Sequence, residues 1–467
     1  MTYRSFDPSF TPHSSSPPLR MAVLSKPSID TLPLELQTEI WALLKRSPST
    51  LGRITQVSRS WHNLATTIPR LWTALYITES TDVDLLRVWL RRGNTLPLSI
   101  EINFRRAVND LSLASYDFTA REMEHYTSLM EALRPFSEQW RSFTVFAPFY
   151  LVFLLKQNFD SSLPTPALTH ISIDLVGSPG LYDRGWTGGG PETNSVFQHA
   201  PPVLAIRTSG YPHSWANFPF HSLTAITLGQ FLHQNTLGWN VFAGAASHSP
   251  NLVSIAFVGE IPSPISAHNT GNSLLVLDLP SLTSLSVTHL NSGHLHHLLH
   301  HLKAPDLRSL ALSLADEDDD FLPFLQAFPL HFPRIATLAL EMLTMNEVAQ
   351  VSLAGFFAPL ARLTTLRLNF DSIPIAIWHA LITPAGDTDF LPRLCEVDFV
   401  DVPLHSLQEL AALRVRAGHR IEVISLHYSS YFYSGSIHYP PSSTTWLEDN
   451  TKSLFLSEGR RSISIWM

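Results

Sequence analysis

Histidines form the densest group of potential metal ligands in the chain. Five lie within eight positions: His294, His296, His297, His300 and His301. The pairs His296/His300 and His297/His301 are spaced by four residues, so each pair could hold a metal ion on one face of a helix. No third ligand is evident, and no glutamate stands between them as in a zinc protease. The surrounding leucines explain this helix as ordinary packing, so we predict no metal site.

Two other segments could suggest ion or nucleotide chemistry. The carboxylate run from Asp316 to Asp320 lacks the spaced oxygens and turn glycine of a calcium loop. It is typical of a solvated helix start, and the alternative is a docking site for a basic substrate. The run from Gly188 to Gly190 lacks the lysine and the serine or threonine of a phosphate loop. No nucleophile elbow occurs, so the sequence predicts a protein that is not an enzyme and has no cofactor.

Composition narrows the class of protein further. The chain has 467 residues, of which 45% are apolar and 15% charged, which indicates a folded protein with a large core. A net charge of −8 argues against a general nucleic-acid binder. Cys395 is the single cysteine, so an internal disulfide is impossible. Neither a long apolar run nor a secretory signal is evident. We therefore expect a cytoplasmic or nuclear protein with no membrane contact.

Helical spacing of apolar residues begins near residue 30. Pro33 suits a first helical turn, and the apolar residues that follow are Leu36, Ile40, Leu43 and Leu44. The Ser47-Pro48-Ser49 segment ends this helix. A second helical set comprises Leu51, Ile54, Val57, Trp61 and Leu64. Pro69 marks another break, and residues 71–77 are typical of a short helix leading into a strand.

The rest of the chain repeats the pattern apolar-x-x-apolar-x-apolar. Nine copies begin at Trp140, Leu168, Leu223, Leu252, Leu282, Leu307, Ile335, Leu363 and Leu394. Starts are 25 to 31 residues apart, except for one gap of 55 in which Val203/Ile206 is a degenerate copy. Each copy predicts a turn and a short strand, and the segments between copies include helices, most clearly from Leu404 to Ala417. Such units bury their faces by stacking, which predicts a solenoid.

Three segments near the N-terminus resemble an F-box. They are Leu32-Pro33-Leu34-Glu35-Leu36, Val57-Ser58-Arg59-Ser60-Trp61 and Pro69-Arg70-Leu71-Trp72, with Glu39-Ile40 between the first two. The family has Leu-Pro-x-Glu-Leu, a hydrophobic helix and Val-(Cys or Ser)-(Arg or Lys)-x-Trp. Ser58 stands where many members have Cys. The stretch from Trp89 to Ile100 further resembles F-box proteins that are abundant in mushroom-forming fungi. The repeats lack the regular asparagine of leucine-rich repeats, so an irregular solenoid is expected.

The resemblance implies a substrate-receptor subunit of a Skp–cullin–F-box ubiquitin ligase. The F-box would bind a Skp-family adaptor, and through it a cullin, while the repeats would bind an unknown protein substrate. The adaptor-binding residues would be Leu32, Pro33, Leu36, Ile40, Leu44, Val57 and Trp61. Trp61 could instead stabilise the F-box internally, and the whole segment could be a helical cap on the solenoid. The alternative function is a leucine-rich-repeat interaction scaffold without a ligase role.

The predicted organisation is α/β, with a helical F-box followed by an irregular leucine-rich-repeat solenoid of strand–helix units and a curved parallel sheet. Residues 1–28 form a Ser/Pro-rich leader expected to be disordered. Residues 29–77 form the F-box-like domain, and residues 78–427 the solenoid, with a glycine-rich insertion at about 177–195. Residues 428–467 form a C-terminal cap or tail.

Overall fold

A computed structural model describes the helical N-terminal region and the strands that follow. The described residues are 32–44, 48–104, 120–148, 151, 164–176, 203–209, 220–229, 239–259, 275–290, 292–314, 331–341, 357, 359–369, 381, 391–400, 402, 404–428, 447 and 449–458. The predicted leader at 1–28, the insertion at 177–195 and the Asp316–Asp320 run lie outside the described residues. Within the described part of the chain, no helix is long and apolar enough to cross a membrane.

Three α-helices and one 3₁₀ helix open the described chain. They are α1 (Leu34–Leu44), α2 (Pro48–Val57), α3 (Arg59–Thr67) and η2 (Pro69–Trp72). The second apolar set does not form one helix as the spacing predicts. Ser58 is extended, with φ −156°, and its hydroxyl oxygen accepts from the Trp61 backbone N–H. This N-cap starts a separate helix, so α2 and α3 take different directions.

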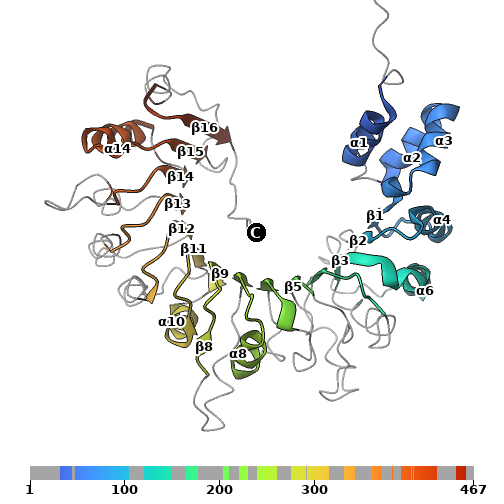
Figure 1. Ribbon diagram of the computed structural model, residues 1–467, viewed down its shortest axis with the longest axis horizontal. Coiled ribbons are helices and arrows are strands. Elements are labelled where there is room, and N and C mark those ends of the chain that lie inside the picture. The colour runs from blue at the N-terminus through green and yellow to red at the C-terminus, as the bar shows by residue number, and fades with distance from the viewer. Residues whose placement is uncertain are drawn as a thin grey trace, which may run out of the picture.

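A single parallel sheet of fourteen strands dominates the described residues, and its strands lie side by side in sequence order. The strands are β1 (Ala74–Ile77), β2 (Leu98–Asn103), β3 (Trp140–Pro148), β4 (His170–Val176), β5 (Ala205–Ser209), β6 (Ala225–Gly229), β7 (Ser254–Val258), β9 (Ser284–Leu290), β11 (Ser309–Leu314), β12 (Thr337–Glu341), β13 (Thr365–Asn369), β14 (Glu396–Val400), β15 (Val423–Tyr428) and β16 (Ser453–Glu458). Two short strands, β8 (Leu277–Asp278) and β10 (Leu302–Lys303), pair separately. The sheet follows an arc consistent with a solenoid (Figure 1).

The register of the sheet matches the repeated apolar pattern. Each of the nine predicted copies supplies one strand, and the degenerate copy at Val203/Ile206 supplies β5. The second apolar positions of four copies form one row across β11 to β14: Leu310, Leu338, Leu366 and Val397. The third positions form the next row on the same face, because side chains two residues apart point to the same side of a strand. One further strand, β16, continues the sheet within residues 428–467.

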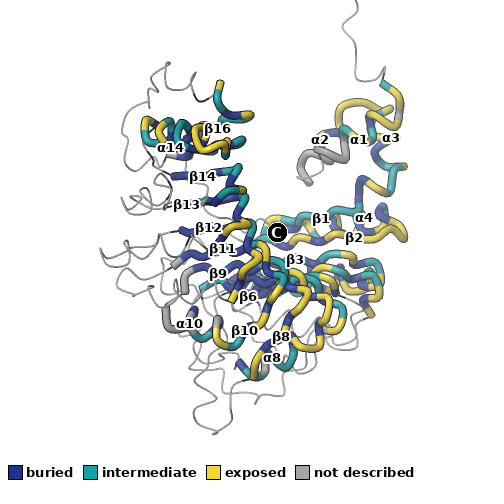
Figure 2. The backbone as a smooth tube through the Cα atoms, turned by 60° about the vertical axis from the view of Figure 1, so that its left-hand side comes forward, coloured by how far each residue is buried: buried dark blue, intermediate teal, exposed yellow. Residues whose placement is uncertain are grey.

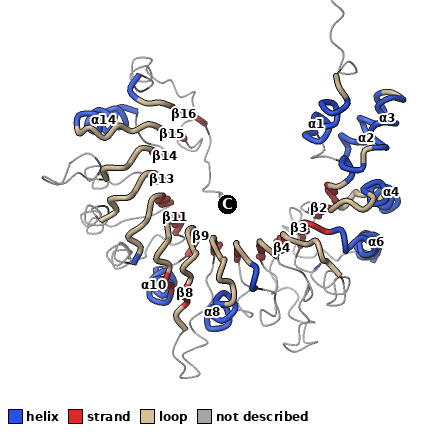
Figure 3. The backbone as a smooth tube through the Cα atoms, viewed as in Figure 1, coloured by secondary structure: helices blue, strands red, loops and turns tan. Residues whose placement is uncertain are grey.

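The core lies between the sheet and the segments outside the arc. The helices α4 (Val83–Gly93), α6 (Ala120–Leu133), α8 (Trp239–Ser247), α10 (Ser292–His301) and α14 (Leu404–Arg416) lie on the outer side, with strands lining the inside (Figures 1 and 3). Short 3₁₀ turns occur at η4 (Arg134–Gln139) and η8 (Phe220–Ser222). One continuous set of buried apolar side chains runs from the N-terminal helices to Leu447. Full burial of each Val, Leu, Ile, Phe or Met side chain contributes about 1.5–3 kcal/mol.

Candidate functional site

The N-terminal helices carry large apolar side chains on their surface. Leu36 of α1 is 52% exposed and Val57 at the end of α2 is 61% exposed. Pro33 is also exposed, and Leu32 is half-buried. The helices α1 and α2 contact each other, and exposed stretches continue over α3 (Figure 2). Large apolar side chains exposed on these short helices are candidates for contact with another protein, provided that they form one contiguous patch.

Two of the predicted site residues face inward instead. Ile40 and Trp61 are partly buried and pack against the core, together with Leu64. Ile54 of α2 and Ala65 of α3 are buried. Trp61 therefore contributes to the interior of the helical region, in agreement with the alternative drawn from the sequence. Leu44 belongs to α1, but its side chain lies outside the described part of the structure.

A buried glutamine fixes the start of α1. The Gln37 side-chain amide donates to the Leu32 carbonyl oxygen at 2.8 Å, and the Gln37 backbone N–H donates to the Pro33 carbonyl at 3.1 Å. Gln37 is buried although it is polar, so these bonds satisfy groups that water cannot reach. They hold the Leu32-Pro33 turn against the helix and thereby set the direction of Leu36. Sequence reasoning did not single out Gln37. The signal that could have found it is a polar residue three positions after Leu34, at helical spacing.

The helical region is joined directly to the first strand of the sheet. The Trp72 indole is buried, and its Nε1 donates to the Ala65 carbonyl oxygen at 2.8 Å. The Arg92 guanidinium of α4 lies 4.6 Å from the Trp72 ring centroid, a cation–π distance. Only Thr73 separates Trp72 from β1. Trp72 therefore packs the end of α3 and the side chain of Arg92 against the segment that leads into β1.

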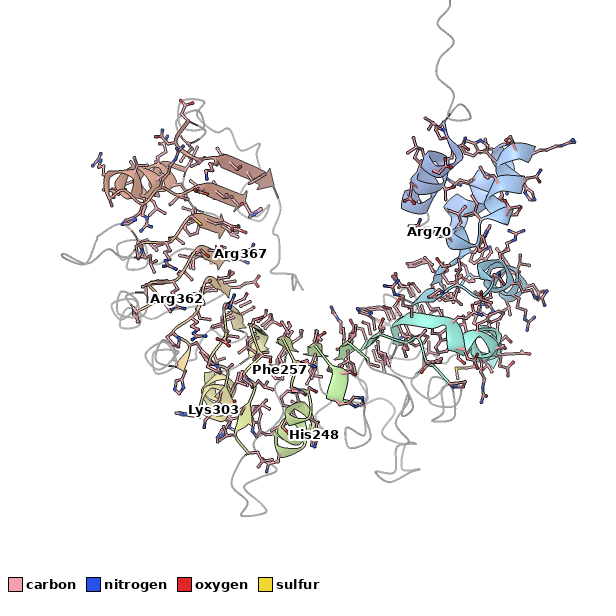
Figure 4. All side chains as sticks on the ribbon, viewed as in Figure 1. Arg70, His248, Phe257, Lys303, Arg362 and Arg367 are labelled. Atoms are coloured by element: carbon pink, nitrogen blue, oxygen red, sulfur yellow. The ribbon has the colours of Figure 1, made fainter. Side chains whose placement is uncertain are left out.

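One ion pair joins α1 to η2 at the surface. Arg70 Nη1 lies 2.8 Å from Glu39 Oε1, and both side chains are more than half exposed. Figure 4 shows Arg70 at the base of the N-terminal helices. Exposed pairs of this kind contribute at most about 1 kcal/mol. This ion pair therefore contributes little stability compared with the burial of the Trp72 side chain.

The histidine-rich helix α10 packs against an aromatic side chain of α8. The His297 and His301 ring centroids are 4.6 Å apart, and the Trp239 ring lies 5.1 Å from His297. Burial, followed by the neighbouring His300, lowers the pKa of His301 below its usual value. Among the side chains that the structure describes, no three His, Cys, Asp or Glu residues are placed to hold a metal ion. His297 and His301 contact each other and the Trp239 ring, and the side chains of His294 and His296 lie outside the described part of the structure.

Burial and neighbouring carboxylates disfavour the reactive form of the single thiol. Cys395 is half-buried beside the start of β14. Burial, Glu422 and Glu396 together raise the pKa of the Cys395 thiol above its usual value. A higher pKa leaves less thiolate at neutral pH, and the thiolate is the reactive form.

Comparison with known families identifies the helical region. Residues 29–78 match the family model described as F-box-like, a span that contains α1, α2, α3, η2 and β1. No curated protein matches the chain. The chain therefore carries an F-box-like domain, and such a domain fits a role as an adaptor or substrate receptor of a ubiquitin ligase. The leucine-rich repeats and the resemblance to fungal proteins stay predictions.

Proposed function

We propose that this chain is the substrate-receptor subunit of a Skp–cullin–F-box ubiquitin ligase. The observation that carries the proposal is the exposure of Leu36 and Val57 on helices that match an F-box-like model. Large apolar side chains contribute most to binding when a partner removes them from water. Leu32 and Pro33 extend this surface, and Gln37 holds them in place. These residues bind the adaptor, whereas Ile40 and Trp61 support the surface from inside.

The proposed mechanism is proximity. The adaptor links the N-terminal helices to a cullin, and the sheet holds a protein substrate near the conjugating enzyme. Tethering of this kind raises the effective concentration of the two reacting proteins, so no catalytic side chain is needed on this chain. The buried Trp72 supports this mechanism, because it packs the end of α3 against the segment that leads into β1 and so joins the F-box-like helices directly to the sheet.

The sheet is interpreted as an irregular leucine-rich-repeat solenoid of residues 78–427. One strand per apolar copy supports this interpretation. The proposed bounds 29–77 and 78–427 put the junction directly after β1 (Ala74–Ile77), although β1 pairs with β2 and β16 (Ser453–Glu458) also continues the same sheet. A cytoplasmic or nuclear location accords with the ligase role.

Capture of a Skp-family adaptor tests the proposal. The full chain is purified with the recombinant adaptor, beside a Leu36→Asp/Val57→Asp variant and a Leu32→Asp/Pro33→Ala variant. We expect the first variant to lose adaptor binding by at least about a hundredfold, because two charges replace apolar side chains that the adaptor would bury. Val253→Asp is the matched control. Val253 is also an exposed apolar residue, at 42%, but it belongs to the sheet region, directly before β7, and not to the N-terminal helices. Equal binding by the parent and the Leu36→Asp/Val57→Asp variant would refute the assigned surface.

The second candidate function is a repeat scaffold without a ligase role. The observation that favours it is the size of the fourteen-stranded sheet relative to the helical region. A chain that captures no adaptor in the experiment above, while retaining its fold, would support the scaffold.

A further inference from the structure

The described sheet ends at β16, and one edge of this strand pairs with no other described strand (Figure 1). We call it the free edge. The Ser453 backbone N–H donates to the Glu422 carbonyl oxygen at 3.1 Å, so the peptide groups of Ser453 face β15. Peptide groups alternate in direction along a strand, which turns those of Leu454, Leu456 and Glu458 toward the free edge. Such an edge is a surface on which a further strand can pair.

Apolar side chains of β16 are incompletely covered. Leu454 packs against the core but is only partly buried, whereas Ile424, its neighbour in the same register row on β15, is 1% exposed. Phe455 points to the opposite, inner face of the sheet and is 57% exposed. Inside a stack of repeats each strand is covered on both sides, and the last one needs a cap. The exposure of β16 therefore indicates where a cap would pack.

The sequence directly after β16 has the pattern of a second hairpin strand. Residues 459–467 lie outside the described residues and read Gly-Arg-Arg-Ser-Ile-Ser-Ile-Trp-Met. Ile463 and Ile465 alternate with serines, which is the period of a strand with one apolar face. Gly459 follows the last residue of β16, at the first central position of a two-residue turn, where a type II′ hairpin requires glycine. The Gly459-Arg460 pair therefore predicts a tight connection.

The register that this turn dictates agrees with the free edge in two ways. A two-residue connection sets Glu458 opposite Arg461, a hydrogen-bonded pair of opposite charges, and Glu458 is a position whose peptide groups face the free edge. The same register pairs apolar positions on the core side of the sheet: Leu456 with Ile463, and Leu454 with Ile465. A connection one residue longer would instead set both isoleucines on the inner face.

We propose that residues 461–466 pair with the free edge of β16 as a further, antiparallel strand of the same chain. This strand supplies backbone partners to the free edge and covers Leu454, and it brings Trp466 diagonally across from the exposed Phe455 ring. An edge occupied in this way cannot pair with β16 of a second copy or with a strand of another protein. The inference does not depend on the proposed receptor function.

Disulfide trapping in the full chain tests the register, with Cys395→Ser as the background that removes the natural thiol. Phe455→Cys/Ser464→Cys sets two thiols on a directly opposite, non-hydrogen-bonded pair, where the Cα atoms lie about 4.5 Å apart and a disulfide fits. The matched control is Phe455→Cys/Ile463→Cys, whose second thiol points to the other face. In a glutathione buffer, peptide mapping should find the first pair crosslinked within one chain at least about tenfold more than the control.

A second measurement needs no new thiol. Hydrogen–deuterium exchange of the peptide covering 453–458 compares the parent chain with Ile463→Asp/Ile465→Asp, which places two charges on the apolar side of the proposed strand. We expect exchange in β16 to become at least about tenfold faster, because the free edge loses its partner. The matched control, Ser462→Asp/Ser464→Asp, adds the same charge on the other side and should change the rate by about threefold or less.

Every outcome supports or overturns the added strand. Selective crosslinking of 455 to 464 within one chain, with faster exchange only in the isoleucine variant, supports it. Equal crosslinking of the two pairs, or none, would show that residues 461–466 hold no register on β16 and would overturn the inference. Crosslinks between two chains would assign the free edge to a second copy instead. Unchanged exchange in the isoleucine variant would likewise refute the pairing.

Discussion

The same residue types behave in opposite ways in the N-terminal helices and in the sheet. Leu36 of α1 is 52% exposed, whereas Leu310 of β11 is 1% exposed. Both were expected from spacing to lie on an apolar face. Leu310 lies in a row with Leu285 and Leu338 from the neighbouring strands, so every copy covers the next. Leu36 has no repeating neighbour to cover it. Spacing thus identifies an apolar face, and only the neighbours decide whether that face forms core or contacts a partner.

The same contrast separates the buried side chains that stabilise the N-terminal helices from the exposed side chains that are available for binding. The helices α1, α2 and α3 have 11, 10 and 9 residues, and helices this short are marginal alone in water. They depend on the few inward side chains, Ile54, Ala65 and Trp72, for attachment to the sheet. Substitutions at these anchors should therefore damage the fold, and those at Leu36 should not.

Trp72→Ala should have the largest effect on stability. Removing a buried tryptophan and its hydrogen bond to Ala65 should cost about 3–5 kcal/mol. Urea unfolding followed by circular dichroism measures the loss. Trp61→Ala is the control, since Trp61 is half-buried and should cost clearly less. Equal losses for the two variants would contradict the anchoring role of Trp72.

The matched pair Leu310→Ala and Leu36→Ala tests the comparison directly. The sheet variant should lose about 2–5 kcal/mol of unfolding free energy, because a cavity remains in a packed row. The helix variant should change stability by about 0.5 kcal/mol or less, as surface substitutions usually do. The same urea titration gives both values. A similar loss in both variants would mean that Leu36 belongs to the core.

Lowering the pH should reduce the free energy of unfolding through His301, which lies in α10 on the outer side of the arc. Its pKa in the folded chain is lowered from 6.5, by burial first and by His300 second. The neutral imidazole is thus favoured in the fold, and its stability contribution is present above about pH 6.5 and lost as pH falls through the lower folded value. The melting temperature should fall between pH 7.5 and about 5.5. His301→Gln cannot titrate at this position and should show a smaller fall; an identical fall would exclude His301 as the cause.

Arg70→Ala should have the smallest effect. The ion pair with Glu39 is more than half exposed at both ends, so its loss should change stability by about 1 kcal/mol or less. Raising the salt concentration should abolish even this difference, because salt screens exposed charges. A salt-independent loss several times larger would show that Arg70 anchors the helices as Trp72 does.

The strands could be predicted because each needs only a local pattern. Leu338 and Leu340 stand two residues apart after a turn, which predicts a half-buried strand, and even the degenerate Val203/Ile206 copy forms β5. The break between α2 and α3 at Ser58 was not predicted. The apolar residues before and after this N-cap keep the same helical spacing that they would have within one helix. Likewise β16 falls in the expected tail, although Leu454 and Leu456 alternate as in a strand.

The candidate site could be predicted only in part. The motif resemblance predicts an F-box-like domain at residues 29–77, and residues 29–78 match the F-box-like model. Sequence spacing could not separate the outward Leu36 and Val57 from the inward Ile40 and Trp61. That division depends on which side of α1 and α3 meets the core, a tertiary contact that neither residue type nor spacing encodes. The adaptor-binding role of individual residues stays a prediction.

Hydrogen–deuterium exchange of the full chain, with and without a recombinant Skp-family adaptor, tests the central claim most directly. We predict that the adaptor slows exchange in peptides covering 32–44 and 48–57, where Leu36 and Val57 lie, and leaves strands β6 to β12 unchanged. Slowed exchange confined to the sheet, or no change anywhere at saturating adaptor, would contradict the account.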